Sequence, residues 1–202
     1  MTTTVTIPPP PTTPVSTVSR YRIVPCRADQ VPDGETLLPG LWRQLHDEGI
    51  FEMFFHDYPD LSFGQFVKCL SNPEEQLDAV VEVDSEGNIT NLAALALLTQ
   101  ILLAPKVHRA IGNFLLFRKY WDHRESGVIG RVILSHWFGN DKLALGVVAG
   151  VTPKLNRAAL SFVHRMGFKS SGEIPDFCSY KGEVCPGVIT RMTRAEWEAL
   201  GG

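Results

Sequence analysis

The stretch "VTPKLNRAALSFVHRMGFKSSG", residues 151–172, decides how the chain folds. An apolar, strand-like run ends at Thr152 and Pro153, which suit the N-cap and the first position of a helix. At the other end, Gly167 supplies the left-handed residue that terminates many helices. Between them, apolar residues recur at helical spacing and form one stripe: Leu155, Ala159, Phe162 and Met166. The stretch therefore predicts a buried strand followed directly by an amphipathic helix.

One residue of this helix is polar where a purely structural helix has no need of it. Asn156 stands in the first turn, at the carboxyl end of the preceding strand. In open sheets with parallel strands, ligands tend to bind at that end of the strands. Asn156 can cap the helix or contact a ligand, and we favour the ligand contact.

Outward from this stretch, apolar periodicity predicts further strands and helices. A strand, a helix and a strand follow one another between residues 108 and 151, which implies a right-handed crossover between two parallel strands. We therefore predict an α+β fold with a mixed central sheet of about six or seven strands, a parallel pair in its middle and about four flanking helices. The expected strands are 21–27, 77–83, 89–104, 108–121, 142–151, 176–184 and 187–193, and the expected helices lie within 33–56, 62–71, 126–138, 153–166 and 194–200.

Two segments leave alternatives open. The run 89–104 is rich in Ala and Leu and suits a helix as well as a strand; we favour a strand because turns and strands surround it. Residues 1–19 are mostly Thr and Pro and bury almost nothing, so we expect a disordered arm that extends from a single domain, 20–202.

Composition excludes several classes of protein. With 19 Lys and Arg against 22 Asp and Glu, the formal net charge is -3, so a nucleic-acid partner is not expected. The longest apolar run, 92–105, is too short to cross a bilayer. The four cysteines lack zinc-ligand spacing, so no metal site is expected, and we interpret them as reduced thiols of a cytoplasmic protein.

A second motif, "RESGVIG" at residues 124–130, opens the expected helix 126–138. Phosphate groups bind where backbone N–H groups are exposed at a helix N-terminus and small residues allow a close approach. Such contacts could come from Arg124, Ser126, Gly127 and Gly130. An ordinary helix capped by Ser126 explains the motif equally well when it is considered alone.

Together the two motifs resemble those of the Gcn5-related N-acetyltransferase (GNAT) superfamily. Its fourth helix carries Asn, Ala, two aliphatic residues, Tyr and then Gly-Phe, and its phosphate loop carries Arg or Gln, two residues, Gly, one residue, then Gly or Ala. Here Asn156 lies 32 residues after Arg124, with room for one helix and one strand between them. The chain looks most similar to divergent members encoded by tailed phages.

The resemblance implies that the two parallel strands splay apart to admit acetyl-CoA. It places the diphosphate against Arg124, Ser126, Gly127 and Gly130, and the pantetheine arm near Asn156. It also implies that backbone between Phe117 and Lys119 faces the thioester. Two positions depart from the family pattern: Ile129 is larger than the loop permits, and Val163 replaces the Tyr that protonates the thiolate.

Acetyl transfer to an amine also needs a proton donor and a base. Because Val163 cannot donate, Tyr180 is our candidate donor, with Ser161 as an alternative. His123 is our candidate base, with Asp122 as an alternative.

Three functions remain open from the sequence. The first is an acetyl-CoA-dependent N-acetyltransferase whose acceptor is a small amine or a protein amino group. The second is a noncatalytic protein of the same fold, with a structural or interaction role, for example in a phage particle. The third, an aminoacyl or peptide transferase, is disfavoured by the net charge of -3. A protein partner or a homodimer is compatible with each.

Overall fold

A seven-stranded mixed sheet organises the chain. The computed structural model describes residues 20–26, 34–54, 60–70 and 75–202, so the predicted arm of residues 1–19 lies outside the described residues. The strand order is β1-β2-β3-β4-β5-β7-β6, and every neighbouring pair is antiparallel except β4 and β5. The predicted α+β fold with a parallel pair in the middle is confirmed. The strands are β1 (Tyr21–Pro25), β2 (Gln76–Val83), β3 (Ile89–Ala104), β4 (Val107–Leu116), β5 (Val147–Pro153), β6 (Lys169–Tyr180) and β7 (Glu183–Thr193).

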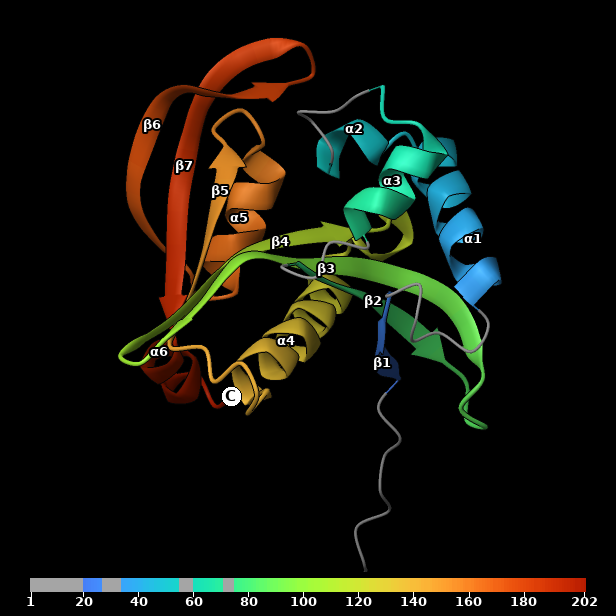
Figure 1. Ribbon diagram of the computed structural model, residues 1–202, viewed down its shortest axis with the longest axis horizontal. Coiled ribbons are helices and arrows are strands. Elements are labelled where there is room, and N and C mark those ends of the chain that lie inside the picture. The colour runs from blue at the N-terminus through green and yellow to red at the C-terminus, as the bar shows by residue number, and fades with distance from the viewer. Residues whose placement is uncertain (1–19, 27–33, 55–59, 71–74) are drawn as a thin grey trace, which may run out of the picture.

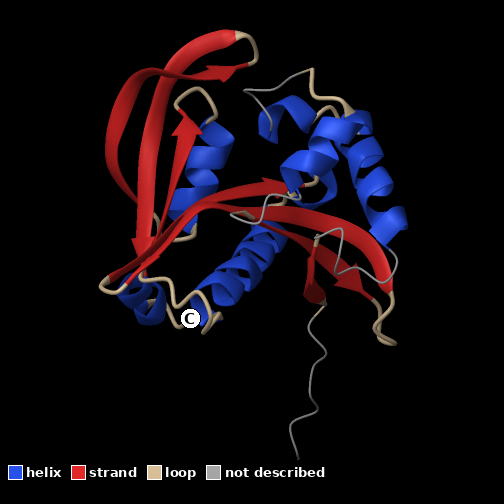
Figure 2. Cartoon of the chain, viewed as in Figure 1, coloured by secondary structure: helices blue, strands red, loops and turns tan. Residues whose placement is uncertain are grey.

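Helices cover both faces of this sheet. Figures 1 and 2 show α1, α2 and α3 above the central strands and the long helix α4 below them. In the described residues, four helices have eight residues or more, close to the predicted number. The helices are α1 (Gly34–Asp47), α2 (Phe51–Phe54), α3 (Phe63–Leu70), α4 (His123–Gly139), α5 (Arg157–Arg165) and α6 (Arg194–Ala199), with a short 3-10 helix, η1, at Arg118–Tyr120.

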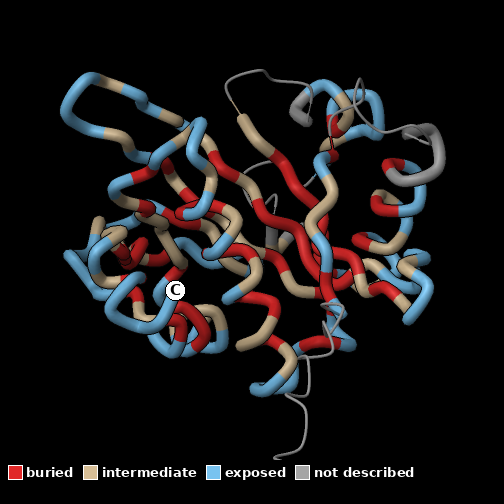
Figure 3. Tube along the Cα trace, turned by 90° about the horizontal axis from the view of Figure 1, so that it is seen from below, coloured by how far each residue is buried: buried red, intermediate tan, exposed pale blue. Residues whose placement is uncertain are grey.

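The Ala- and Leu-rich run 89–104 forms strand β3, as predicted. Four consecutive residues from Ala93 to Ala96 are fully buried, because helices lie on both faces of the sheet at this point. Figure 3 shows the buried residues concentrated along the strands in the middle of the molecule. No described helix combines the length and apolarity that crossing a membrane requires.

Several predicted boundaries were wrong: β5 begins at Val147 and not at 142, and β6 spans Lys169–Tyr180 and not 176–184. Side-chain capping explains two further differences. The strand expected at 108–121 ends at Leu116, where η1 begins the connection to α4. Helix α4 begins at His123 and not at Ser126, because the Asp122 carboxylate accepts the first-turn N–H groups. Helix α5 begins at Arg157, because Asn156 is its N-cap; the predicted cap and first residue, Thr152 and Pro153, still belong to β5.

The core beneath β4 is built on Trp137 of α4. This side chain is fully buried and stacks on Phe114, with 4.8 Å between ring centroids. Gly112 provides the room, since a Cβ at this position would lie 2.6 Å from Cζ3 of Trp137. The indole Nε1 of Trp137 finds no hydrogen-bond partner among the described residues. A large aromatic side chain therefore fills the core at the cost of one unsatisfied donor.

Candidate functional site

The two parallel strands of the sheet separate halfway along their length. They pair at Arg109↔Val147, Ala110↔Val148 and Ile111↔Ala149, and no further pair follows. Beyond that point, β4 stays on β3 as far as Leu116, and β5 stays on β7 as far as Pro153. Each strand therefore has one edge whose backbone N–H and C=O groups face a gap and have no strand partner. The splayed pair predicted from the resemblance is confirmed.

A cavity of about 100 Å³ occupies this gap. Residues of β4, β5 and α5 form most of its wall, and Met53 of α2 and Thr190 of β7 complete it. A larger, shallower hollow of about 330 Å³ lies on the surface of α1 and is lined by Trp42, His46 and Phe63, among others. We take the gap as the candidate site because it lies inside the sheet, where two adjacent strands leave facing edges of unpaired backbone. The gap is lined by Gly112, Asn113, Phe114, Gly150, Val151, Thr152, Asn156, Ala159, Phe162, Val163 and Phe168, among others.

Asn156 both caps a helix and faces the cavity. Its Oδ1 accepts a hydrogen bond from the N–H of Ala159 at 3.1 Å, and its side chain belongs to the lining of the gap. The two interpretations of Asn156 from the sequence are therefore compatible. Its position after Pro153, at the carboxyl end of β5, is the one predicted.

Two polar residues of the gap were not predicted from the sequence. Thr190 is 1% exposed and lies opposite Gly150 on the neighbouring strand, and Asn113 lies on β4. The available signal was Gly150, because a glycine inside an apolar strand often marks a close approach of backbone. A Cβ at Gly150 would lie 2.9 Å from the carbonyl oxygen of Gly112. The two strands therefore still approach each other closely at Gly112 and Gly150, one residue beyond their last pair.

The N-terminus of α4, where the sequence predicted phosphate contacts, is capped by the chain itself. The Oδ1 atom of Asp122 accepts hydrogen bonds from the N–H groups of Arg124 at 2.8 Å and Glu125 at 3.1 Å. These bonds hold the pKa of Asp122 below its ordinary value. In the preceding η1, the N–H of Arg118 donates to the Glu48 carboxylate at 2.8 Å. Two carboxylates thus occupy donors that a phosphate could use.

The predicted phosphate residues of α4 have two different environments. Arg124 is exposed, and among the described residues an added Cβ at Gly127 would meet only the guanidinium of Arg131, 4.0 Å away. Ser126 and Gly130 are buried and face α5: the Ser126 hydroxyl accepts from Arg165 at 3.4 Å, and a Cβ at Gly130 would meet Sδ of Met166 at 2.7 Å. Gly130 therefore allows α4 and α5 to pack closely.

The predicted thioester-facing segment, from Phe117 to Lys119, is also engaged. Phe117 is fully buried, and its N–H donates to the carbonyl of Ala93 at 3.1 Å. Lys119 extends its side chain toward Glu82, 3.0 Å away. Neither residue lies in the lining of the gap.

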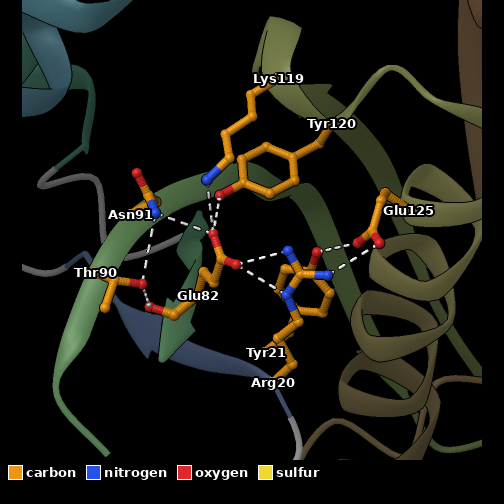
Figure 4. A network of polar contacts seen from close by, with 8 residues as sticks. All are labelled: Arg20, Tyr21, Glu82, Thr90, Asn91, Lys119, Tyr120 and Glu125. Carbon is orange, nitrogen blue, oxygen red and sulfur yellow. Dashed lines mark hydrogen bonds and ion pairs between the residues drawn. The ribbon is translucent and has the colours of Figure 1, made fainter. Parts of the chain in front are cut away.

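Glu82, on β2, is the centre of a polar network (Figure 4). Its carboxylate accepts from the hydroxyl of Tyr120 at 2.6 Å and Nε of Arg20 at 2.8 Å. Lys119 and Asn91 each donate to it at 3.0 Å. The hydrogen bond from Tyr120, helped by the two cations, lowers the pKa of Glu82 to about 2.

The same network joins the first strand to α4. Arg20 also contacts Glu125 at 3.0 Å, and the hydroxyl of Tyr21 donates to Glu125. Burial and this hydrogen bond raise the pKa of Tyr21. Because Glu125 stands in the first turn of α4, the network fixes that turn against β1.

We expect the substitution Glu82→Gln to destabilise the protein by about 2 kcal/mol near neutral pH, because it removes the charge that several donors share. The pKa of Glu82 is lowered from 4.5 to about 2, so its contribution is complete above pH 4.5 and is lost as the pH falls toward 2. The stability difference between wild type and variant should therefore shrink over this range. Urea denaturation at several pH values measures it. Glu86→Gln, in an exposed turn, is the control, and a difference that does not change with pH would contradict the assignment.

Comparison with solved structures identifies the architecture. Spermidine N-acetyltransferase from Vibrio cholerae, in complex with CoA and spermine, matches with a TM-score of 0.69 at 14% identity, over 89% of this chain and 99% of that chain. Its complex with manganese ions matches with a TM-score of 0.62 at 14% identity, over 91% of this chain and 98% of that chain. The chain has the GNAT fold. No family model matches the sequence, and neither does any curated protein.

Within this GNAT fold, the two predicted catalytic side chains lie apart from the gap. Tyr180 closes the β6–β7 hairpin opposite Glu183, next to the turn at Lys181. His123 is the exposed first residue of α4. Neither belongs to the lining of the cavity, whereas Val163 does. Of the sequence-predicted site residues, the structure brings only Asn156 into the gap.

Proposed function

We propose that the protein is an acetyl-CoA-dependent N-acetyltransferase that acetylates an amine. The observation that carries this proposal is the gap between β4 and β5, with one unpaired backbone edge on each side and Asn156 at its end. The solved neighbour that holds CoA and spermine supports it.

The pantetheine arm of CoA suits this gap. It is narrow and flexible and carries two amide groups, which can hydrogen-bond with an unpaired strand edge as a further strand would. Phe114 and Phe162 provide an apolar wall for its methylene groups, and Thr190 offers a hydroxyl. The phosphates would meet exposed cations on α4 and its surroundings, among which we propose Arg124 and Arg131.

The reaction can proceed without an acidic side chain that protonates the leaving thiolate. The amine nitrogen attacks the thioester carbonyl carbon, the carbon–sulfur bond breaks, and the amine proton leaves to a base. Because thiols are far more acidic than alcohols, with a pKa of about 8.5 for a cysteine side chain, the thiolate is a good leaving group and can take its proton from water. We therefore propose that Val163 is compatible with turnover, and that Tyr180 and His123 act only if the acceptor brings them closer to the gap.

Two measurements on the full chain test the proposal. Calorimetry with acetyl-CoA tests binding, and release of free thiol in the presence of spermidine, spermine and simple primary amines tests transfer. We expect binding together with thiol release that depends on an amine. Absence of binding would contradict the proposal as a whole.

The cap of α4 predicts an unusual gain of affinity. Asp122→Asn keeps an oxygen that can cap the helix but removes a negative charge from the place where the diphosphate is proposed to lie. We expect acetyl-CoA to bind about three- to tenfold more tightly to this variant. Asp141→Asn, just beyond the other end of α4, makes the same charge change and should leave affinity unchanged. Equal effects in both variants would place the diphosphate elsewhere.

A noncatalytic role on the same fold is the second candidate, and the capped N-terminus of α4 favours it. Carboxylates of Asp122 and Glu48 already use N–H groups near that end. A protein of this kind, for example a structural component of a phage particle, would show neither acetyl-CoA binding nor thiol release. Binding without thiol release would point to a fold that keeps its ligand but has lost the reaction.

A further inference from the structure

The edge hairpin of the sheet holds two thiols opposite each other. Strand β6 has a single neighbour, β7, and the two are joined by a two-residue turn at Lys181 and Gly182. In this hairpin, Cys178 and Cys185 are direct cross-strand partners. Directly opposed residues of an antiparallel pair project to the same face of the sheet.

Burial distinguishes these two residues from their surroundings. Of the twelve residues of β6, eight are exposed and only Cys178 is buried, at 4% exposure. Cys185 is 3% exposed and is the first buried residue of β7. Both thiols therefore lie on the protected face of a strand pair whose other side chains in this part mostly face water.

The backbone geometry is that of a disulfide. Opposed residues of an antiparallel pair have Cα atoms about 4.5 to 5.5 Å apart, and disulfides span Cα separations of about 4.4 to 6.8 Å. The cross-strand register of this pair is therefore compatible with a disulfide once the two side chains rotate toward each other. At present Sγ of Cys178 leans toward Gly187, where an added Cβ would lie 3.2 Å from it.

We propose that Cys178 and Cys185 are a site of reversible disulfide formation. Both thiols lose their protons and one electron each, a sulfur–sulfur bond forms, and a disulfide oxidant such as oxidised glutathione is reduced to two thiols. The bond closes an eight-residue loop, from 178 to 185, and fastens the end of β6 to β7.

Cys26 provides the contrast. Cys26 follows β1, at the other edge of the sheet, where it lies beside β2 and is 1% exposed. Burial raises the pKa of its thiol to about 12. Its partner in the backbone ladder is Leu77, not a cysteine. We therefore expect Cys26 to stay a thiol under conditions that oxidise the hairpin pair.

A peptide map tests the proposal. The full chain is equilibrated in glutathione redox buffers, free thiols are blocked by alkylation, and the protein is digested with trypsin. Cleavage after Lys169, Lys181 and Arg191 places the two cysteines on separate peptides, 170–181 and 182–191. We expect these peptides to be joined, with a mass two hydrogens below their sum, and to separate on reduction.

Stability gives a second readout. Oxidation should raise the melting temperature of the wild type by about 5 °C and leave that of the Cys185→Ser variant unchanged. The Cys26→Ser variant should still form the joined peptide. The proposal is overturned if the folded wild type yields only separate or glutathione-bound peptides at full oxidation, or if the joined peptide forms only in urea. Neither readout depends on acetyl-CoA or an amine.

Discussion

The Ala159→Phe variant should lose acetyl-CoA binding almost completely. Ala159 lies in the first turn of α5 and lines the gap between β4 and β5. A phenylalanine ring is comparable in size to the cavity of about 100 Å³, so it would occupy the space proposed for the pantetheine arm. We expect affinity to fall by at least about 100-fold, equivalent to about 2.7 kcal/mol.

The neighbouring residue offers a matched control. Ala158 stands on the same turn of α5, is exposed, and is not part of the lining. Ala158→Phe makes the same change of size and helix propensity and should leave affinity within about twofold of the wild type. Calorimetry measures the affinity of both variants for acetyl-CoA, and their melting temperatures verify that they fold. Equal affinity in the two variants would mean that acetyl-CoA binds outside the gap.

The second large effect concerns stability. Trp137→Ala should cost about 3 to 5 kcal/mol, because it leaves a cavity under β4 where Gly112 and Phe114 now contact the indole. For a chain of this length, the melting temperature should fall by roughly 6 to 20 °C. Urea denaturation of the variant and the wild type measures the loss.

Replacement of the same residue by phenylalanine separates packing from hydrogen bonding. Trp137→Phe keeps an aromatic ring against Phe114 and removes the Nε1 donor that has no partner among the described residues. Relief of that unsatisfied donor offsets part of the lost volume, so we expect a cost below about 1.5 kcal/mol. A cost as large as that of Trp137→Ala would show that the indole N–H is satisfied, for instance by a buried water.

The fold could be predicted because its signals are local. Hydrophobic periodicity, turn residues and Gly167, which has a φ of 95°, located most of the strands and helices, although β6 begins at Lys169 and not at the predicted 176. The motif around Asn156 correctly predicted a helix directly after β5 and located part of the wall of the gap. These features depend on neighbours in the sequence, which a single chain displays directly.

The remaining parts of the site depend on contacts between distant segments. The residues around Glu48 form no sequence pattern that predicts a hydrogen bond from the N–H of Arg118, 70 residues away, to the Glu48 carboxylate. Gly130 fits a phosphate-loop pattern, yet its surroundings are set by Met166 of another helix. Thr190 reaches the cavity only because β7 lies beside β5. Sequence spacing could not distinguish a ligand contact from a packing contact at such positions.

The irregular outer strand also limits how copies of this protein can associate. Between Ile174 and Cys178 the pairing of β6 with β7 slips, Pro175 lacks an N–H, and Asp176 adopts a φ of 51°. A second molecule could not extend the sheet past this point, because the free edge offers neither a straight backbone nor a continuous row of donors. The irregular backbone of β6 thus disfavours a continuous sheet between two copies at this edge.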